Sequence, residues 1–600
     1  MESEQRFARV YDFLRIRSTY SLYLYAVIIG NIAGFFALAF SYALGLVEHQ
    51  LLGIWGGLDM TPPAGEFHFP GGGGTPNRWL LFLLPATGGL LVGLITYYFG
   101  SELSGSGTDH LINAFHRREG NLQRRIPFLK SLTTTITLAT GGSGGKEGPT
   151  GLIGAGIGAW IGRALNTGAR ARRTLLLVGA AGGLGAIFRA PLGGALTAVE
   201  VVYRQDIESD SLIPCIIASV TGHLVYTSIA GSGSVFHVTD VRFENYWELV
   251  IYFPLALLCF AIGGFFASVF KRSREMFNRI KLHPILKPAL GGVGVGCLGL
   301  LFPEIIGTGF GFLQKILNGQ NPTGIMGNTD PLSLASAFLA IALFKVAATT
   351  LTISSGGSAG VFGPSLFIGG MLGGFVGTLA TYFLPGWNIS VVSFVLVGMG
   401  SFFSGVAHAP IAGMIMVCDM VGSYKLLPPL MIVSILAIMF SRHGSIYTGQ
   451  VKNRFQSPAH YWDMNLDVLD TMVVGRVFTE FRDAAVVKKN MLLSQLEELG
   501  LELQATDFII VNPNGSYHGV LSLRRVRLTQ QLEPIRNLVT LEDADITIPA
   551  VNLESTLGDA FQIIMKHDVD KVAVIADDRV AGYLTHRDIL NIYGKKVKRK

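Results

Sequence analysis

A short glycine-rich segment carries the two charged residues of a long apolar tract. Between Leu132 and Ile161 the only charged side chains are Lys146 and Glu147, and they lie in the sequence Thr140-Gly-Gly-Ser-Gly-Gly-Lys-Glu-Gly-Pro-Thr150. A carboxylate at bilayer depth costs about 2.5–3.5 kcal/mol on insertion scales, so such a residue usually has a partner or a task. The Gly-Pro pair that follows Glu147 is typical of a helix start, and it predicts a helix over Thr150–Trp160.

The beginning of that helix is a place where an anion can bind. Its first N–H groups have no partner within the helix and carry the positive end of the helix dipole. Glu147 is itself an anion at this place, so it can occupy the site and leave it when it is protonated or displaced, which predicts a gate. The alternative is a structural glutamate that caps a buried helix end. A phosphate-binding loop is excluded, because position 147 would need Ser or Thr.

The composition predicts a helical membrane protein with a smaller soluble part. Half of the 600 residues are apolar, only 15% are charged, and the chain contains 75 glycines. The net charge of +6 is explained by basic loops at 117–130 (Arg117 to Lys130) and 170–173, which we assign to the cytoplasm. No basic stripe with interleaved aromatic residues indicates nucleic-acid binding, and the four cysteines lack the spacing of disulfides or metal ligands.

The chain order gives three parts. We expect a cytoplasmic amphipathic segment at 1–19, a transmembrane domain at 20–451 and a cytoplasmic domain at 452–600, which places both termini in the cytoplasm. Many of the apolar segments are too short to cross about 30 Å of hydrocarbon. Short helices at membrane depth are tolerated where they are buried in protein or line a cavity. The expected segments are 21–46, 79–99, 110–115, 150–160, 174–188, 190–202, 212–229, 247–270, 290–302, 334–351, 361–383, 391–403, 409–418 and 427–440.

The transmembrane part contains an internal repeat, with halves at about 20–230 and 247–440. Gly145-Lys-Glu-Gly-Pro149 matches Gly360-Val-Phe-Gly-Pro364, which sets Glu147 opposite Phe362. At similar distances downstream, an Ala-Pro helix start follows in each half, and each of these helices reaches an acid, Glu200 or Asp419. Paired interrupted helices in two halves indicate a substrate site at the repeat interface, and helix N-termini there would bind an anion.

These motifs resemble the CLC family of chloride channels and proton-coupled chloride transporters. Gly105-Ser106-Gly107 resembles the family's first anion-binding motif, although the usual Ile-Pro is replaced by Thr108-Asp109; taken alone, this triplet is typical of a helix N-cap. Tyr447 lies at the position of the family's anion-contacting tyrosine, and Glu147 at that of its gating glutamate. The motif glycines are Gly105, Gly107, Gly145, Gly148, Gly360 and Gly363.

The resemblance implies an all-helical fold with two inverted halves and a homodimer with one pore per subunit. It also implies that chloride contacts the hydroxyls of Ser106 and Tyr447 and the N–H groups of Val361 and Phe362. Neutral donors suit a conducted monovalent anion, because full positive charges would hold it too tightly. We therefore expect a chloride-selective, voltage- or pH-gated channel in the lipid bilayer, with Glu147 as the gate.

A chloride/proton antiporter is the alternative function. In proton-coupled members a second glutamate relays protons, and this chain has Val201 at that position, directly after Glu200. A valine cannot carry a proton, which favours the channel, and Glu200 is expected to have a structural partner. A membrane enzyme is disfavoured because no catalytic or metal-binding motif is present.

The tail predicts two similar α+β modules. Strand–turn–strand patterns occur around Asn514-Gly515 and again around Asp577-Asp578, each beside a helical stretch. The tail resembles a pair of CBS modules, in which the ending Thr585-His-Arg-Asp588 would bind the ribose of an adenine nucleotide such as ATP, ADP or AMP. The first copy has Arg525 where the acid belongs. One nucleotide site and a purely structural tail both remain open.

Overall fold

The computed structural model divides the chain into two compact units, Met1–Ala459 and His460–Lys600. This division falls slightly after the expected boundary at 451/452. Apart from Thr19, the amphipathic segment expected at 1–19 lies outside the described residues, as does Arg525. The described residues are 19–59, 61–71, 73–238, 241, 243, 247–320, 330–440, 445–460, 469, 472–476, 479–480, 486–502, 507–522, 540–541, 549–567, 569, 571–576 and 579–597.

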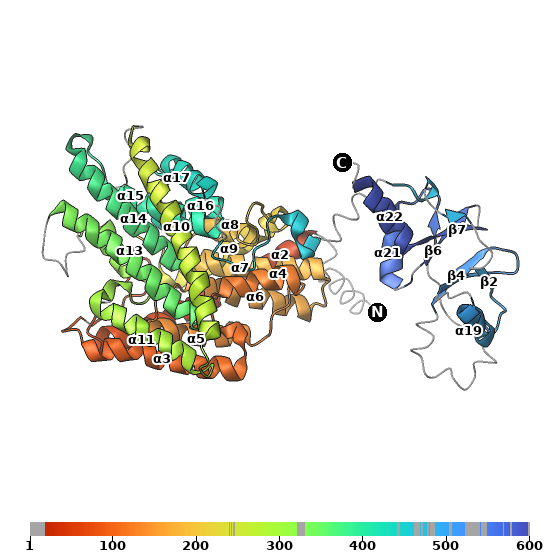
Figure 1. The fold of residues 1–600 in the computed structure, drawn as a ribbon, viewed down its shortest axis with the longest axis horizontal. Helices are drawn as coiled ribbons and strands as arrows, with labels where there is room; N and C mark the ends of the chain where they lie inside the picture. The colour runs from red at the N-terminus through yellow and green to blue at the C-terminus, as the bar shows by residue number, and fades with distance from the viewer. Residues whose placement is uncertain are drawn as a thin grey trace, which may run out of the picture. The chain divides into compact units, whose positions relative to one another are not determined.

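The first unit is built from helices, many of them apolar (Figure 1). In the described part of the chain, six helical stretches are long and apolar enough to cross a membrane, and four further apolar helices are shorter. The helices are α2 (Thr19–Glu48), α3 (Arg78–Phe99), α4 (Gly107–Arg117), α5 (Ile126–Ala139), α6 (Glu147–Ala164), α7 (Ala169–Ile187), α8 (Pro191–Glu200), α9 (Leu212–Ala230), α10 (Glu248–Arg279), α11 (Leu286–Leu301), α12 (Phe310–Leu317), α13 (Pro331–Ser354), α14 (Phe362–Phe383), α15 (Val391–Ala407), α16 (Pro410–Val421) and α17 (Leu427–Phe440).

The predicted apolar segments are confirmed as helices, and two helices are additional. Helix α5 was not expected, because four threonines and a lysine lower the hydropathy of its sequence. Helix α12 was not expected because it has only eight residues, which include Gln314 and Lys315. The segment expected at 110–115 is longer and forms α4.

Each repeat contains two helices that cross at glycines. A Cβ atom on Gly154 in α6 would lie 2.1 Å from the carbonyl oxygen of Gly179 in α7, and the reverse distance would be 2.0 Å. In the second repeat, Gly369 of α14 and Gly398 of α15 approach each other in the same way, at 2.2 Å in both directions. Only glycine allows two helix backbones to come this close. The same crossing is therefore built twice.

The two repeats are joined at equivalent residues. The N–H of Gly145 donates to the carbonyl of Gly360 at 2.8 Å, and the N–H of Gly360 donates to the carbonyl of Gly145 at 2.7 Å. Further out, the N–H of Ser143 donates to Thr352 Oγ1, and the N–H of Ser358 donates to Thr137 Oγ1. Equivalent residues that exchange equivalent bonds are related by a local two-fold axis. A two-fold axis that lies in the membrane plane produces an inverted repeat, which is the arrangement that the resemblance implies.

Other equivalent helices also pack together. Figure 1 shows α3 beside α11, and α8 of the first repeat contacts α16 of the second. The N-terminal ends of α6 and α14 meet at the Gly145–Gly360 pair, which lies immediately before both helices. The fold therefore brings the motif of each repeat to the centre of the first unit.

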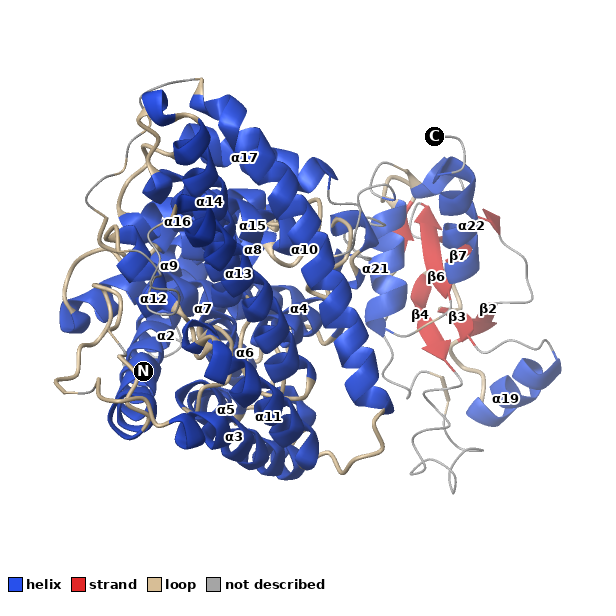
Figure 2. Cartoon of the chain, turned by 60° about the vertical axis from the view of Figure 1, so that its left-hand side comes forward, coloured by secondary structure: helices blue, strands red, loops and turns tan. Residues whose placement is uncertain are grey.

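The second unit is α+β, and Figure 2 shows its strands in red. One sheet has the order β2-β3-β4 and the other the order β1-β7-β6-β5. Each contains a parallel pair (β2/β3 or β5/β6) and an antiparallel hairpin (β3/β4 or β6/β7), which confirms the two similar patterns seen in the sequence. The elements are β1 (Thr479–Glu480), β2 (Val486–Lys488), α19 (Leu493–Glu502), β3 (Asp507–Val511), β4 (Tyr517–Ser522), β5 (Val551–Asn552), α21 (Leu557–His567), β6 (Lys571–Ala576), β7 (Arg579–Thr585) and α22 (His586–Val597).

Candidate functional site: an anion site between helix N-termini

The three glycine motifs converge on one point in the first unit. A Cβ atom on Gly107 would lie 2.6 Å from the carbonyl oxygen of Gly148, and one on Gly360 would lie 2.9 Å from the nitrogen of Gly148. A Cβ atom on Gly145 would lie 2.8 Å from the nitrogen of Gly363. Because these contacts leave no room for side chains, the N-terminal turns of α4, α6 and α14 approach one another through their backbones. Gly105 belongs to the same assembly, since its N–H donates to the carbonyl of Gly357 at 2.9 Å.

Glu147 lies at the centre of this assembly. Its side chain is buried at 1% exposure, and it is the first residue of α6. Oε2 lies 2.2 Å from the position of a Cβ on Gly145 and 2.9 Å from that of a Cβ on Gly363, so the carboxylate is folded toward the first turn of α14. It interacts there with the N–H groups of Glu147 and Gly363, but neither oxygen completes a hydrogen bond of normal geometry within the described chain. The carboxylate thus occupies a place that suits an anion.

Ser106 adds a hydroxyl to this place. It stands at the N-cap position of α4, but its side chain makes no capping hydrogen bond, so the N-cap interpretation of the triplet is wrong for this hydroxyl. Ser106 is 6% exposed, and its Oγ finds no partner among the residues that the structure describes. A buried hydroxyl without a partner costs free energy, which indicates that a ligand can satisfy it.

Tyr447 and the start of α14 complete the candidate site. Tyr447 is 1% exposed, and its hydroxyl interacts with the side chain of Thr108 and lies within electrostatic range of Glu147. Val361 is the N-cap residue of α14 and Phe362 its first residue, so their N–H groups belong to a free helix end. The ring of Phe362 packs between those of Phe188 and Phe403, at centroid distances of 4.5 and 4.0 Å. This aromatic contact fixes the turn that presents the N–H groups.

Two buried lysines near the site were not recognised in the sequence. Lys130 was assigned to a basic cytoplasmic loop, and this is wrong, because it is fully buried in α5 and its Nζ donates to the carbonyls of Leu103 and Gly105 at 3.0 and 2.9 Å. In the second repeat, Lys345 donates in the same way to the carbonyls of Ile305 and Gly307, at 2.9 and 2.8 Å. A buried ammonium group that is bonded to loop carbonyls holds the loop in one conformation.

The lysines reveal a third pair of equivalent motifs. Gly307-Thr308-Gly309 ends just before α12, and Gly105-Ser106-Gly107 ends at the first residue of α4. Gly105 and Gly307 share a left-handed conformation, with φ of 67° and 61°. The two hydroxyls differ in their bonding. Thr308 accepts a weak capping bond of 3.4 Å from the N–H of Phe310, whereas Ser106 makes none. The signal that could have located this motif was the Gly-Ser/Thr-Gly pattern itself, which occurs in each repeat near the start of a helix.

Glu200 and Val201 lie at the C-terminal end of α8. Val201 is 2% exposed and follows the last residue of α8. Glu200 accepts hydrogen bonds from the N–H groups of Ile411 and Ala412 in the first turn of α16, at 3.2 and 2.7 Å. In return, Asp419 at the end of α16 accepts from the N–H of Gly193 in the first turn of α8, at 3.0 Å. The structural partner that we expect for Glu200 is therefore a helix N-terminus.

Thr585 and Asp588 form the N-terminal cap of α22. Oδ2 of Asp588 accepts from the N–H and the hydroxyl of Thr585, and Thr585 Oγ1 accepts from the N–H of Asp588 at 3.1 Å. The same reciprocal cap is made by Thr556 and Asp559 at α21. The pattern is a capping box, which satisfies free N–H groups at a helix start.

Comparisons with known proteins agree with this geometry. The family described as "Voltage gated chloride channel" matches residues 88–442, and the CBS domain matches residues 544–595. The chain is 32% identical over 361 residues to the "Putative chloride channel protein ClcB-like" of Ralstonia nicotianae, a match that covers 60% of this chain and 81% of that protein. It is 27% identical over 439 residues to the "H(+)/Cl(-) exchange transporter ClcA" of Salmonella newport, covering 71% and 87%.

Solved structures show the same fold. A slow cyanobacterial Cl-/H+ antiporter aligns with a TM-score of 0.60 at 20% identity, covering 71% of this chain and 96% of that one. A eukaryotic CLC transporter aligns with a TM-score of 0.58 at 17% identity, covering 96% and 98%. The chain therefore belongs to the voltage-gated chloride channel family, the CLC family of anion channels and transporters, and it carries a C-terminal CBS domain. It is a multi-pass membrane protein of anion transport and not an enzyme.

Proposed function

We propose that this protein is a chloride-selective channel in which Glu147 is the gate. The observation that carries the proposal is the placement of the Glu147 carboxylate at the start of α14, where the anion would otherwise be held. A charged glutamate there excludes chloride, and a protonated or displaced one frees the N–H groups of Val361 and Phe362. The hydroxyls of Ser106 and Tyr447 supply neutral donors on the same path, which suits an ion that must also leave.

The gate is tested by chloride efflux from liposomes that contain the full-length protein. Glu147→Gln and Glu147→Ala are expected to keep or raise the flux and to remove most of its dependence on pH, because neither side chain can be charged. Unchanged pH dependence in both variants would show that another group gates the pore.

The channel is favoured over the antiporter by the residues at the end of α8. Val201 carries no proton, and Glu200 is engaged by two N–H groups of α16. A chloride/proton antiporter is the second candidate, because ClcA relatives are named exchangers and the cyanobacterial neighbour is named an antiporter. The two are separated by imposing a chloride gradient across liposomes and recording protons. Chloride flux without proton movement supports the channel, and stoichiometric uphill proton movement supports the antiporter.

The assembly, orientation and tail follow from the family resemblance. We propose a homodimer with one pore per subunit, gating by voltage or pH, and cytoplasmic placement of both termini. The basic loop around Arg117 and Arg125 supports this orientation. We also propose that the tail binds an adenine nucleotide, with Thr585 and Asp588 at the ribose, since CBS domains often do so and the capping box fixes both side chains at one point.

A further inference from the structure

A buried ion pair stands directly beside the proposed gate. Lys146 precedes Glu147 at the start of α6 and is 3% exposed. Its Nζ lies 2.7 Å from Oε1 of Glu66, whose side chain is 23% exposed. Glu66 is distant in sequence, because it lies in the segment that connects α2 to α3. The connecting segment therefore places the Glu66 carboxylate next to Lys146, the residue that precedes Glu147.

The backbone around Glu66 is held in a fixed position. The N–H of Gly65 donates to the carbonyl of Val235 at 3.0 Å, and the N–H of Glu66 donates to that of Pro63 at the same distance. A Cβ atom on Gly65 would lie 2.5 Å from the carbonyl oxygen of Ser234, so only glycine allows this approach. The backbone contacts thus hold Glu66 in position to pair with Lys146.

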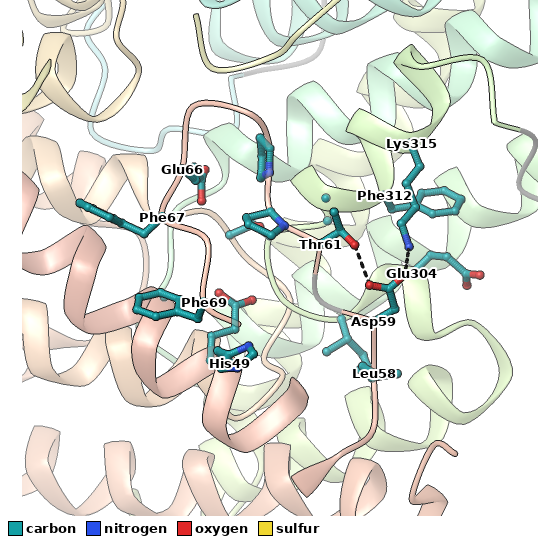
Figure 3. Close-up of a pocket in the computed structure, with 18 of the residues that line it drawn as sticks. His49, Leu58, Asp59, Thr61, Glu66, Phe67, Phe69, Glu304, Phe312 and Lys315 are labelled. Carbon is teal, nitrogen blue, oxygen red and sulfur yellow. Dashed lines mark hydrogen bonds and ion pairs between the residues drawn. The ribbon is translucent and has the colours of Figure 1, made fainter. Parts of the chain in front are cut away.

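The ion pair borders a cavity of about 340 Å³ (Figure 3). Glu66, Glu48, His49 and Glu304 line it, together with Asp59. Figure 3 shows that Asp59 is engaged by its own partners: it accepts from Lys315 and Thr61, both at 2.6 Å. The bond from Lys315 holds the pKa of Asp59 below its usual value. Asp59 is therefore an acid of the same cavity whose charge is offset by Lys315 and not by Lys146. This makes Asp59 a control for Glu66.

The charges around the gate come from several elements. Lys146 and Glu66 both act on Glu147, with opposite signs. Lys345 acts on Glu147 and on Glu48, Tyr447 lies within range of Glu147, and Tyr226 lies within range of Lys146 and of Arg189. Within this set, Lys146 and Glu66 form the pair at hydrogen-bond distance. Removal of either member leaves the other without its hydrogen-bonded partner beside the gate.

We infer that Glu66 is a positioning residue of the gate, which acts by holding and neutralising Lys146. The inference rests on the proposed role of Glu147. With Glu66 in place, Lys146 is turned toward the cavity and its charge is offset. Without the charge of Glu66, Lys146 retains the charged carboxylate in the anion site and keeps the pore closed. Without Lys146, Glu66 repels that carboxylate, and the pore opens more readily.

The inference predicts opposite shifts from the two partners. Glu66→Gln is close in shape and keeps an acceptor, and it should move the pH of half-maximal flux to a more acidic value by about one unit, a tenfold change in proton concentration. Lys146→Met should move it to a more alkaline value by a similar amount. The double variant should lie near the wild type, and so should Glu66→Asp, which keeps the charge.

The experiment measures chloride efflux from liposomes with full-length protein at equal pH on both sides, from acidic to alkaline. Asp59→Asn is the control, and its midpoint should stay with the wild type. Shifts of the two single variants in the same direction, or no shift in either, would overturn the inference. Loss of folding is distinguished from these outcomes because it lowers the flux without moving the two midpoints apart.

A second series in the Glu147→Ala background separates this inference from the proposed function. Both shifts should vanish there, because the group on which the pair acts is gone. If the wild-type pH response itself survives Glu147→Ala, the proposed gate is refuted. If that response needs Glu147 but is not moved by Glu66→Gln and Lys146→Met, only the role of Glu66 is refuted.

Discussion

Glu200, at the end of α8, allows a test of how much the hydrogen bonds between the two repeats stabilise the fold. In Glu200→Ala, the N–H groups of Ile411 and Ala412 lose their acceptor in a region where Glu200 itself is only 5% exposed. A hydrogen bond to a charged group contributes about 1.5–3 kcal/mol, and the 3.2 Å bond to Ile411 is the weaker of the two. We therefore expect a loss of about 2–3 kcal/mol in the free energy of unfolding.

The measurement is the thermal unfolding midpoint of the purified protein, recorded with chloride efflux and proton movement in liposomes. Glu200→Gln keeps an acceptor, so its midpoint should fall less than that of Glu200→Ala and its chloride flux should stay near the wild type. Asp419→Ala is the control at the equivalent position, where it removes the bonds that Asp419 accepts from the N–H of Gly193 and from the hydroxyl of Tyr424. If Glu200→Gln keeps the midpoint but abolishes proton movement that the wild type performs, Glu200 is a proton relay and the structural assignment is refuted.

Three further predictions concern the pore and the tail. Ser106→Pro removes the unpartnered hydroxyl and should shift the reversal potential toward nitrate; an unaltered chloride/nitrate ratio would count against Ser106 as a ligand. Glu147→Gln should conduct chloride at a pH where the wild type is closed, as read from efflux at alkaline pH. Asp588→Ala should weaken adenine-nucleotide binding by the full-length protein about tenfold or more, because a hydrogen bond to a charged acceptor is lost. Asp559→Ala loses the same kind of helix cap and should leave binding unchanged; equal losses in both variants would show that capping alone explains the effect.

The sequence predicted the repeat and the residues that meet at its centre because both depend on residues with few substitutes. Gly145, Gly148 and Gly360 contact other backbones, so no other residue fits, and their spacing is visible without a structure. Glu147 was recognisable because a lone acid in an apolar tract requires an explanation. The predicted fold class is also confirmed. The many apolar segments leave few alternatives to a helical membrane protein.

The missed residues depend on contacts that are distant in sequence. Lys130 follows a run of arginines, and only its burial against the carbonyls of Leu103 and Gly105 distinguishes it from a loop residue. Glu66 lies in a polar Gly/Pro-rich connection, and its importance follows only from its contact with Lys146. A charge is easily read from a sequence, but its partner is set by the tertiary fold.

The exchange of hydrogen bonds between Gly145 and Gly360 has a consequence for the origin of the chain. Because equivalent residues contact each other, the same surface serves both sides of the junction, as in an isologous dimer. Two copies of a half-length ancestor, inserted in opposite orientations, would already have made this contact without any complementary change. In the present chain the two halves differ beyond the shared glycine, and at the second residue one half has Glu147 where the other has Phe362. The asymmetry that the proposed gate requires therefore lies two residues from a contact that is itself symmetric.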